Sequence, residues 1–488
     1  MILHRQIDVG GADAATRLPG QTAHDLVLPF PGQAPAAAEF VILFVVYLFI
    51  RKIDAINSNQ IEDNENLLKV YQKELSYLHH DFSCFDIGEQ YINPHHEFSF
   101  DMDLFGKDSL FHRINRTVTS GGSDYLARTL SNTEVPSIQE ISFHREAIRE
   151  LAERESLRST FLSYGQRDYI DTDAVLHALN TIRQVHIPRL TLSTFSLIIA
   201  IGSLIVFYAL LIGTIWGPLP YTLPMFWAII QIILAFAICS RPLKLIYQVI
   251  NVIYPRLKKC LNMMILIVNS DLKSQENQDV INQLSSGQSD AIESFKQLKK
   301  ILHRIDQRNE VWIPISNAFF LGDYFLVRKF LQWQKKNMAH IEDWILALSH
   351  FDALVSMATF RYNEPSSIDA EFVEADEVVF QTKGIYHPFL GEKAIPNDFT
   401  INNLHYYIIT GANMAGKRTF LRSIGINYIL ALCGMPVFAK SLTVSIFSLF
   451  SSMRTSDDLA NGISYFNAEL LRLQQLLDTL ALRQAEQL

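Results

Sequence analysis

Apolar and polar positions follow each other along most of the chain at the three- and four-residue spacing of amphipathic helices. This spacing predicts that residues 53–190 and 241–363 are mostly helical. Asn363, Glu364 and Pro365 then interrupt the spacing, and short apolar runs such as Tyr406–Ile409 suit buried strands. We therefore expect a mixed α/β part over residues 364–488.

Two stretches between the helical parts carry no charge at all. Leu192–Trp216 has 25 such residues and Tyr221–Ser240 has 20, with Gly217–Pro220 as the turn between them. Each is long enough to cross a hydrocarbon core of about 30 Å. Residues 191–240 are therefore predicted to form a transmembrane hairpin, and the alternative is a hairpin buried in a large core. Basic residues flank the pair and place both ends in the cytoplasm: Arg183, Arg189, Arg241, Lys244, Arg256, Lys258 and Lys259.

A third apolar run, Phe40–Ile50, is followed directly by Arg51 and Lys52. Eleven residues are short for a membrane span. We interpret residues 39–52 as a short anchor, while an interfacial segment and a buried helix remain alternatives. Residues 1–38 hold four prolines and no periodicity, so we expect a disordered tail.

Composition excludes some classes of function. With 42 basic and 50 acidic residues the formal net charge is −8, so no overall basic field favours nucleic acid. The four cysteines lie far apart and show no metal-binding spacing. The fifteen histidines show no ligand pattern either, and no metal site is predicted.

The most informative motif begins at Gly411. Gly411, Gly416 and Lys417 match the G-x-x-x-x-G-K pattern, whose backbone N–H groups surround phosphates while the lysine reaches the outer ones. The next residue should be Ser or Thr, whose hydroxyl binds Mg²⁺, but here it is Arg418. Thr419 cannot replace that hydroxyl, because one step along a helix turns a side chain by about 100°.

The residues inside this loop and several other segments resemble the MutS family, the DNA mismatch-repair ATPases of the ABC type. The resemblance is carried by G-x-N-M-x-G-K with the following T-F-L-R, and by two further groups near the loop. A weaker resemblance lies at residues 110–151, which are similar to the family's helical lever domain. The groups near the loop are Tyr386–Leu390 with Ile395–Asp398, and Thr455–Ser464, which is similar to D-D-L-A-x-G-x-S.

The resemblance implies an ATP site and a homodimer formed through the ATPase domains. Tyr386, His387 and Pro388 would lie near the adenine, and the signature residues Gly462 and Ser464 would reach the nucleotide of the second subunit. The residues that would bind the phosphates in the same subunit are Gly411, Ala412, Asn413, Met414, Ala415, Gly416, Lys417, Arg418 and Thr419.

Departures from the family pattern limit these implications. Nothing before residue 100 resembles the family's mismatch-probing domain, and the apolar hairpin stands where its DNA clamp would be. No acidic strand motif appears before Leu488, so we expect a C-terminally truncated or inactive relative with no assigned catalytic residue. Because Arg418 stands in place of the Mg²⁺-binding hydroxyl, we also expect that Mg²⁺ coordination is lost.

The predicted fold class is mixed: a helical lever domain with a transmembrane hairpin, followed by a partial α/β P-loop ATPase domain. The predicted function is that of a membrane-associated, MutS-like ATP-binding protein with its main parts in the cytoplasm. Its expected partners are ATP, a second copy of the chain and membrane lipid, and DNA is a partner that neither the charge nor a mismatch-recognition domain supports. One alternative is a membrane scaffold with a degenerate nucleotide site. The other is a soluble, DNA-binding mismatch-repair ATPase.

Overall fold

The structure is a computed structural model. By the contacts between its residues, the chain divides into two units, Met1–Glu62 and Asp63–Leu488, and each is described by itself. The residues that the structure describes are 33–166, 169–183, 193–285, 290–308, 312–375, 377–401, 405–453 and 465–486. Most of the predicted tail therefore lies outside the described residues.

The described part of the first unit is the beginning of helix α1, which runs from Gln33 to Leu78. The apolar run predicted as an anchor lies inside this helix, where the side chains of Phe40, Leu43 and Phe49 are 70, 68 and 63% exposed. Eleven consecutive apolar residues cover every side of a helix, so this segment has no polar face to turn toward water. Its role as an anchor stays a prediction.

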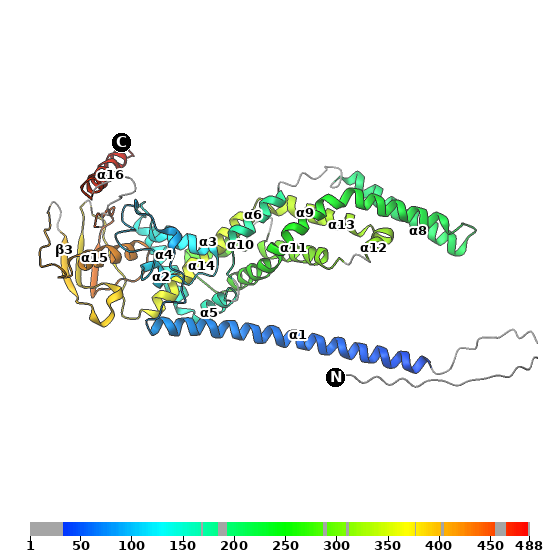
Figure 1. The fold of residues 1–488 in the computed structure, drawn as a ribbon, viewed down its shortest axis with the longest axis horizontal. Coiled ribbons are helices and arrows are strands. Elements are labelled where there is room, and N and C mark those ends of the chain that lie inside the picture. The colour runs from blue at the N-terminus through cyan, green and yellow to red at the C-terminus, as the bar shows by residue number, and fades with distance from the viewer. Residues whose placement is uncertain are drawn as a thin grey trace, which may run out of the picture. The chain divides into compact units, whose positions relative to one another are not determined.

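Helix α14 (Ile341–Asn363) is the centre of the helical part of the second unit (Figure 1). Every residue from Phe351 to Phe360 is buried. A helix that is buried on all sides needs neighbouring elements all round it. Those neighbours are α2 (Leu110–Ile114), α3 (Ser120–Leu130), α4 (Ile138–Glu153), α9 (Thr222–Val268) and α10 (Gln275–Ser285).

One carboxylate lies inside this packing. Asp352 of α14 accepts hydrogen bonds from the backbone N–H groups of Val118 and Thr119 and from the Thr119 hydroxyl, at 3.1, 2.8 and 2.6 Å. The Thr119 hydroxyl oxygen also accepts from the N–H of Gly122 and so caps α3. The buried polar group is thus satisfied, as a core requires.

The remaining helices of the second unit surround α9 and α14 or follow the sheet. These helices are η1 (Glu89–Tyr91), α5 (Glu155–Ser163), α6 (Thr172–Arg183), α11 (Ala291–Asp306), α12 (Trp312–Phe320), α13 (Gly322–Asn337) and α16 (Tyr465–Glu486).

Local signals mark several helix starts in the second unit. Ser137 and Glu140 form a capping box at the start of α4, and Asp290 caps α11.

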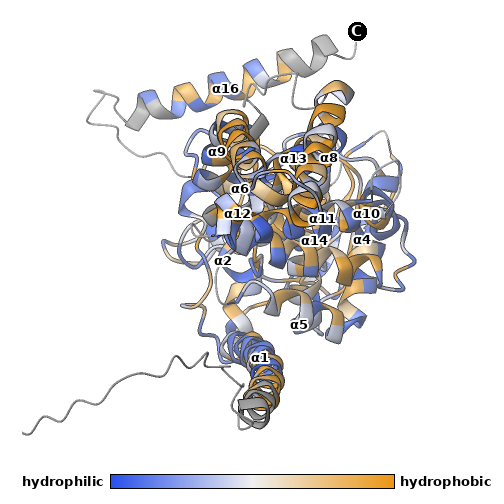
Figure 2. Cartoon of the chain, turned by 90° about the vertical axis from the view of Figure 1, so that its right-hand side faces the viewer, coloured by the Kyte–Doolittle hydropathy of each residue, from blue (hydrophilic) through white to orange (hydrophobic). Residues whose placement is uncertain are grey.

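The predicted apolar hairpin is formed by α8 (Thr194–Trp216) and α9. Both helices are long and apolar enough to cross a membrane, over Thr194–Trp216 and Thr222–Gln248, and only 11 and 22% of these windows are buried. Most of their apolar side chains are exposed. Figure 2 shows the predominantly hydrophobic colour of α8 and of the part of α9 beside it. The interpretation as a buried core hairpin is therefore not supported. Helix α9 continues past the predicted boundary at residue 240, through Pro242 and Pro255.

A small polar network joins the two helices of the hairpin. The indole N–H of Trp227 donates to the carbonyl oxygen of Ser203 at 3.1 Å, and the amide of Gln231 donates to the Ser203 hydroxyl at 2.9 Å. Gln231 is fully buried. Polar bonds of this kind hold helices together in an apolar surrounding, where the hydrophobic effect contributes little to their association.

The α/β part contains a four-stranded mixed sheet with the order β1-β4-β2-β3. Strand β4 runs parallel to β1 and antiparallel to β2, and β3 pairs antiparallel with β2. Within the second unit, Figure 1 shows the sheet and α15 at the end away from the hairpin. The elements are β1 (Glu371–Phe372), β2 (Phe380–Ile385), η2 (Pro388–Lys393), β3 (Asn397–Ile401), α15 (Lys417–Leu432) and β4 (Ser441–Val444).

The fold class is thus confirmed in its coarser form: a mostly helical protein with a small mixed sheet and two apolar helices.

Candidate phosphate-binding loop

The loop Gly411–Gly416 leads directly into the N-terminus of α15. Two of its residues have left-handed backbone angles, Met414 with φ 63° and Gly416 with φ 82°. Glycine adopts this region without strain, which lets the chain turn into the helix at Gly416. No side chain caps the helix, so the first amide groups of α15 remain available to a ligand.

The two cations of the motif occupy the first helical turn. The Lys417 Nζ donates to the carbonyl oxygens of Gly411 and Ala412 at 2.5 and 2.9 Å, which folds the side chain back over its own loop. Arg418 is exposed, and the first turn holds no acidic residue. A helix N-terminus favours anions over cations. The arrangement therefore gathers positive charge where an incoming anion would neutralise it.

The prediction of a buried strand at Tyr406–Ile409 is wrong. No strand forms over residues 405–410, and Tyr406 and Ile408 are 99 and 87% exposed. A strand is defined by its ladder of hydrogen bonds to neighbours, and the described strands pair only with one another. An apolar run by itself cannot supply those neighbours.

Aromatic contacts connect the loop to the edge of the sheet. The ring of Phe399 on β3 lies 5.4 Å from the ring of Phe420 on α15 and 5.4 Å from that of Tyr407. Both contacts are edge-to-face, a favourable arrangement for aromatic pairs. They position the first turn of α15 against β3.

The three residues predicted near the adenine lie against the middle of α15. The Asn427 side chain donates to the Tyr386 carbonyl at 3.1 Å and accepts from the N–H of Phe438 at 2.6 Å. Asn427 lies ten residues beyond Lys417, about 15 Å along the helix. His387 and Pro388 begin the η2 turn and are half-buried.

Charge around His387 is positive. Burial, followed by the neighbouring guanidinium groups of Arg422 and Arg113, lowers the pKa of His387 to about 4. The ring is therefore neutral at physiological pH, and its Nδ1 accepts from the N–H of Phe389 at 3.3 Å.

The other predicted residues have more ordinary surroundings. Asn413 is exposed, the N–H of Ala415 donates to the Ala412 carbonyl at 3.2 Å, and the carbonyl of Thr419 accepts from Ser423. Gly462 and Ser464 lie outside the described residues.

Sequence reasoning missed the groups that join α15 to the helical part. Arg422 forms an ion pair with Asp103 at 2.5 Å and donates to the Asp101 carbonyl at 2.9 Å. Gly425 approaches Met102 so closely that an added Cβ would lie 2.5 Å from its sulfur. These partners are more than 300 positions apart in the sequence, and no local pattern predicts such pairs. These contacts fasten α15 to the segment before α2.

Comparison with known proteins shows which family the part around the loop resembles. Residues 407–484, which include the loop and α15, match the family model described as MutS domain V. Similar proteins include the DNA mismatch repair proteins MutS of Staphylococcus aureus strains JH9 and Newman. Each is 30% identical over 186 residues, which cover 36% of this chain and 21% of the relative.

These matches relate residues 407–484 to domain V of the MutS family. The chain spans about a fifth of the length of the curated relatives that it matches.

Proposed function

We propose that this MutS-like protein is attached to a membrane by α8 and α9 and binds the phosphates of ATP at the loop Gly411–Thr419. The observation that carries the nucleotide part is the joint position of Lys417 and Arg418 on an uncapped helix N-terminus, behind the loop. This combination of free amide groups and cations suits a polyphosphate.

The substitution at Arg418 sets the metal dependence in this proposal. A guanidinium pairs with phosphate oxygens as a planar fork but coordinates no cation. ATP binding is therefore weak and almost independent of Mg²⁺, and phosphate transfer, which depends on the metal, is near background. Substituting Arg418→Ser supplies the hydroxyl and makes binding depend on Mg²⁺.

Equilibrium titration of the full chain in detergent with a fluorescent ATP analogue, with and without Mg²⁺, tests the nucleotide part. Lys417→Ala abolishes binding, whereas Lys383→Ala, an exposed lysine on β2, leaves it unchanged and serves as the control. Binding that is absent in the unmodified chain, or unaffected by Lys417→Ala, would contradict the proposal and favour a scaffold with a degenerate site.

The exposure of α8 and α9 supports the membrane part. At 23 residues α8 is about 35 Å long, which matches a hydrocarbon core of about 30 Å. At the turn of the hairpin Trp216 and Tyr221 are 86 and 70% exposed, as suits aromatic residues at a membrane interface. Vesicle flotation with protease protection tests it: the two helices float with lipid, and both chain parts that flank them are cleaved from one side. Protein that remains soluble without detergent would contradict it.

We propose no role in recognising mismatched DNA. The net charge of −8 supplies no basic field. Matched and mismatched duplexes should bind equally weakly at physiological salt, and a tenfold preference for the mismatch would overturn this part of the proposal.

The open face of the loop suits a second copy of the chain. Met414 at its tip is fully exposed, so a bound nucleotide would be uncovered on that side. Chemical crosslinking from Met414→Cys, with and without ATP, tests whether nucleotide brings two loops together.

A further inference from the structure

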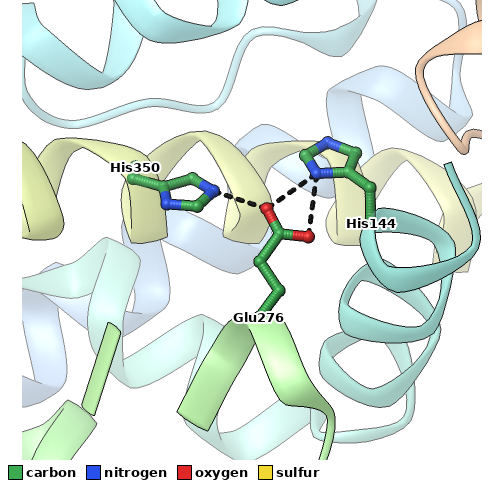
Figure 3. A group of neighbouring side chains, drawn as sticks. All are labelled: His144, Glu276 and His350. Atoms are coloured by element: carbon green, nitrogen blue, oxygen red, sulfur yellow. Dashed lines mark hydrogen bonds and ion pairs between the residues drawn. The ribbon is translucent and has the colours of Figure 1, made fainter. Parts of the chain in front are cut away.

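Three side chains from three helices meet in the helical part, away from the phosphate-binding loop (Figure 3). Glu276 of α10 accepts from His144 Nδ1 of α4 at 2.9 and 3.1 Å and from His350 Nε2 of α14 at 2.7 Å. One ligand atom of each residue lies within 4.8 Å of the other two. The side chains are only 14 to 20% exposed.

The packing around this cluster positions its members. Glu150 of α4 accepts hydrogen bonds from the backbone N–H groups of Lys273 and Ser274 and from the Asn277 amide, which fastens the start of α10 to α4. Glu276 therefore lies in the first turn of a fixed helix. The Tyr125 ring stacks on His350 with centroids 4.5 Å apart and holds that imidazole in place.

The surroundings leave room for a further ligand. His144 and Glu276 line a cavity of about 410 Å³, together with Tyr125 and Asp279. The Nε2 of His144 is buried and has no hydrogen-bond partner among the described residues. A site with three protein ligands next to a cavity resembles the open geometry in which water completes a metal's coordination.

We propose that His144, Glu276 and His350 bind a divalent transition-metal ion, with zinc as the expected occupant. Two imidazoles and one carboxylate suit zinc, iron, cobalt or nickel, whereas Mg²⁺ and Ca²⁺ prefer oxygen ligands alone. Tetrahedral ligand atoms about 2.1 Å from zinc lie about 3.4 Å from one another. The ring nitrogens of His144 and His350, now 2.9 and 2.7 Å from the carboxylate, must therefore move away from it by about 0.5 and 0.7 Å, and the two nitrogens, which lie within 4.8 Å of each other, must reach the same spacing.

Metal at this position would join α4, α10 and α14. The cavity beside it is also lined by Ile429 and Cys433, at the C-terminal end of α15. The ion would thus brace the junction between the helical part and the helix that follows the loop. This inference does not depend on nucleotide binding, so either can fail without the other.

Metal titration of the full chain in detergent tests the site. After removal of bound metal with a chelator, Zn²⁺ is titrated against a chromophoric competitor, and Co²⁺ is titrated with detection of its visible absorption. We expect one tight ion per chain and a Co²⁺ spectrum typical of nitrogen ligands, with no displacement by Mg²⁺. A chain that binds neither ion, or that releases the ion to Mg²⁺, would overturn the proposal.

Single substitutions locate the ion. His144→Gln, Glu276→Gln and His350→Gln should each weaken Zn²⁺ binding by about 100-fold or more, because even the loss of a partner behind a ligand costs up to that factor. His303→Gln is the matched control, because the ring of His303 on α11 contacts Tyr254 and is not a member of the cluster. Unchanged affinity in the three variants would show that the ion binds elsewhere, which contradicts the site.

If a substituted variant fails to fold, thermal unfolding of the unmodified chain still tests the metal site. Zn²⁺ should raise its thermal midpoint, since a ligand that binds only the folded state stabilises it. A midpoint that does not change with Zn²⁺ would mean that the three side chains form a hydrogen-bonded brace alone.

Discussion

Helices α8 and α14 have the same length of 23 residues but opposite surroundings. In α14 every residue from Phe351 to Phe360 is buried, and its polar side chains have partners inside the protein. In α8 only Ala200 and Phe207 are buried, although the helix is the more apolar of the two. Protein covers α14, whereas it leaves most of the apolar side chains of α8 exposed.

The comparison separates two reasons for which a chain contains an apolar helix. A core helix tolerates a carboxylate such as Asp352 because neighbouring amide groups satisfy it. A helix in lipid has no such neighbours on its outer side, and the absence of charge along α8 agrees with the membrane span that we propose. Polar residues inside the hairpin accordingly bond between α8 and α9.

The largest expected effect is in the core. Phe351→Ala removes a fully buried ring and should lower the free energy of unfolding by about 3–5 kcal/mol. Ile198→Ala, on the exposed side of α8, should change it by no more than about 0.5 kcal/mol. Chemical denaturation of both variants in detergent measures the difference, and equal effects would remove the contrast between the two helices.

A charge tests the surroundings of α8 directly. Ile198→Arg should cost about 2.5–3.5 kcal/mol if the helix lies in lipid, and should reduce the fraction of chain that floats with vesicles. Leu346→Arg on α14 is the control. Leu346 is 49% exposed, but the residues on either side of it in α14 are buried inside the protein. Flotation that is insensitive to Ile198→Arg would show that α8 faces water.

The buried carboxylate of α14 predicts a pH dependence. Burial raises the pKa of Asp352 from 3.8 to about 7, against the opposing effect of hydrogen bonds from Thr119 and Val118. Because the folded-state value lies above the unfolded one, its contribution to stability is complete below about pH 4 and is lost as pH rises toward 7. The slope is at most about 1.4 kcal/mol per pH unit for one proton.

Asp352→Asn preserves the shape of the side chain and removes the titration. Denaturation at several pH values should therefore give a flatter profile for this variant than for the unmodified chain between about pH 4 and pH 7. An identical slope in both proteins would mean that another group causes it.

The smallest effect is expected where α14 ends and the sheet begins. Burial alone raises the pKa of Asp369, but hydrogen bonds from Arg361 and Arg149 lower it to about 2. The folded-state value lies below 3.8, so the stabilisation is present above about pH 4 and is lost as pH falls toward 2.

Asp369→Asn should therefore destabilise the chain at pH 7 by about 1 kcal/mol or less, because Arg149 is half-exposed and solvent screens the pair. Thermal midpoints at pH 7 and at about pH 3, where part of the stabilisation is lost, measure this. A larger difference at the lower pH would contradict the assigned sign.

Much of the helical structure follows from local sequence. The start of α4 at Ser137 and Glu140 and the turn between α8 and α9 use residues that are close together in the chain. Local pattern failed at Tyr406–Ile409, because a strand needs partners that an apolar run does not specify.

The sequence by itself determined the resemblance to the MutS family, the loop that leads into α15, and the two uncharged helices, since these depend on contiguous residues and their order. Only the tertiary structure decided which apolar helix is covered, because burial depends on neighbours that are distant in the chain. It also brought together His144, Glu276 and His350, of which the first two are 132 positions apart and the last two 74. Packing of three separate helices brings these side chains within bonding distance, and no spacing within a single helix encodes that proximity.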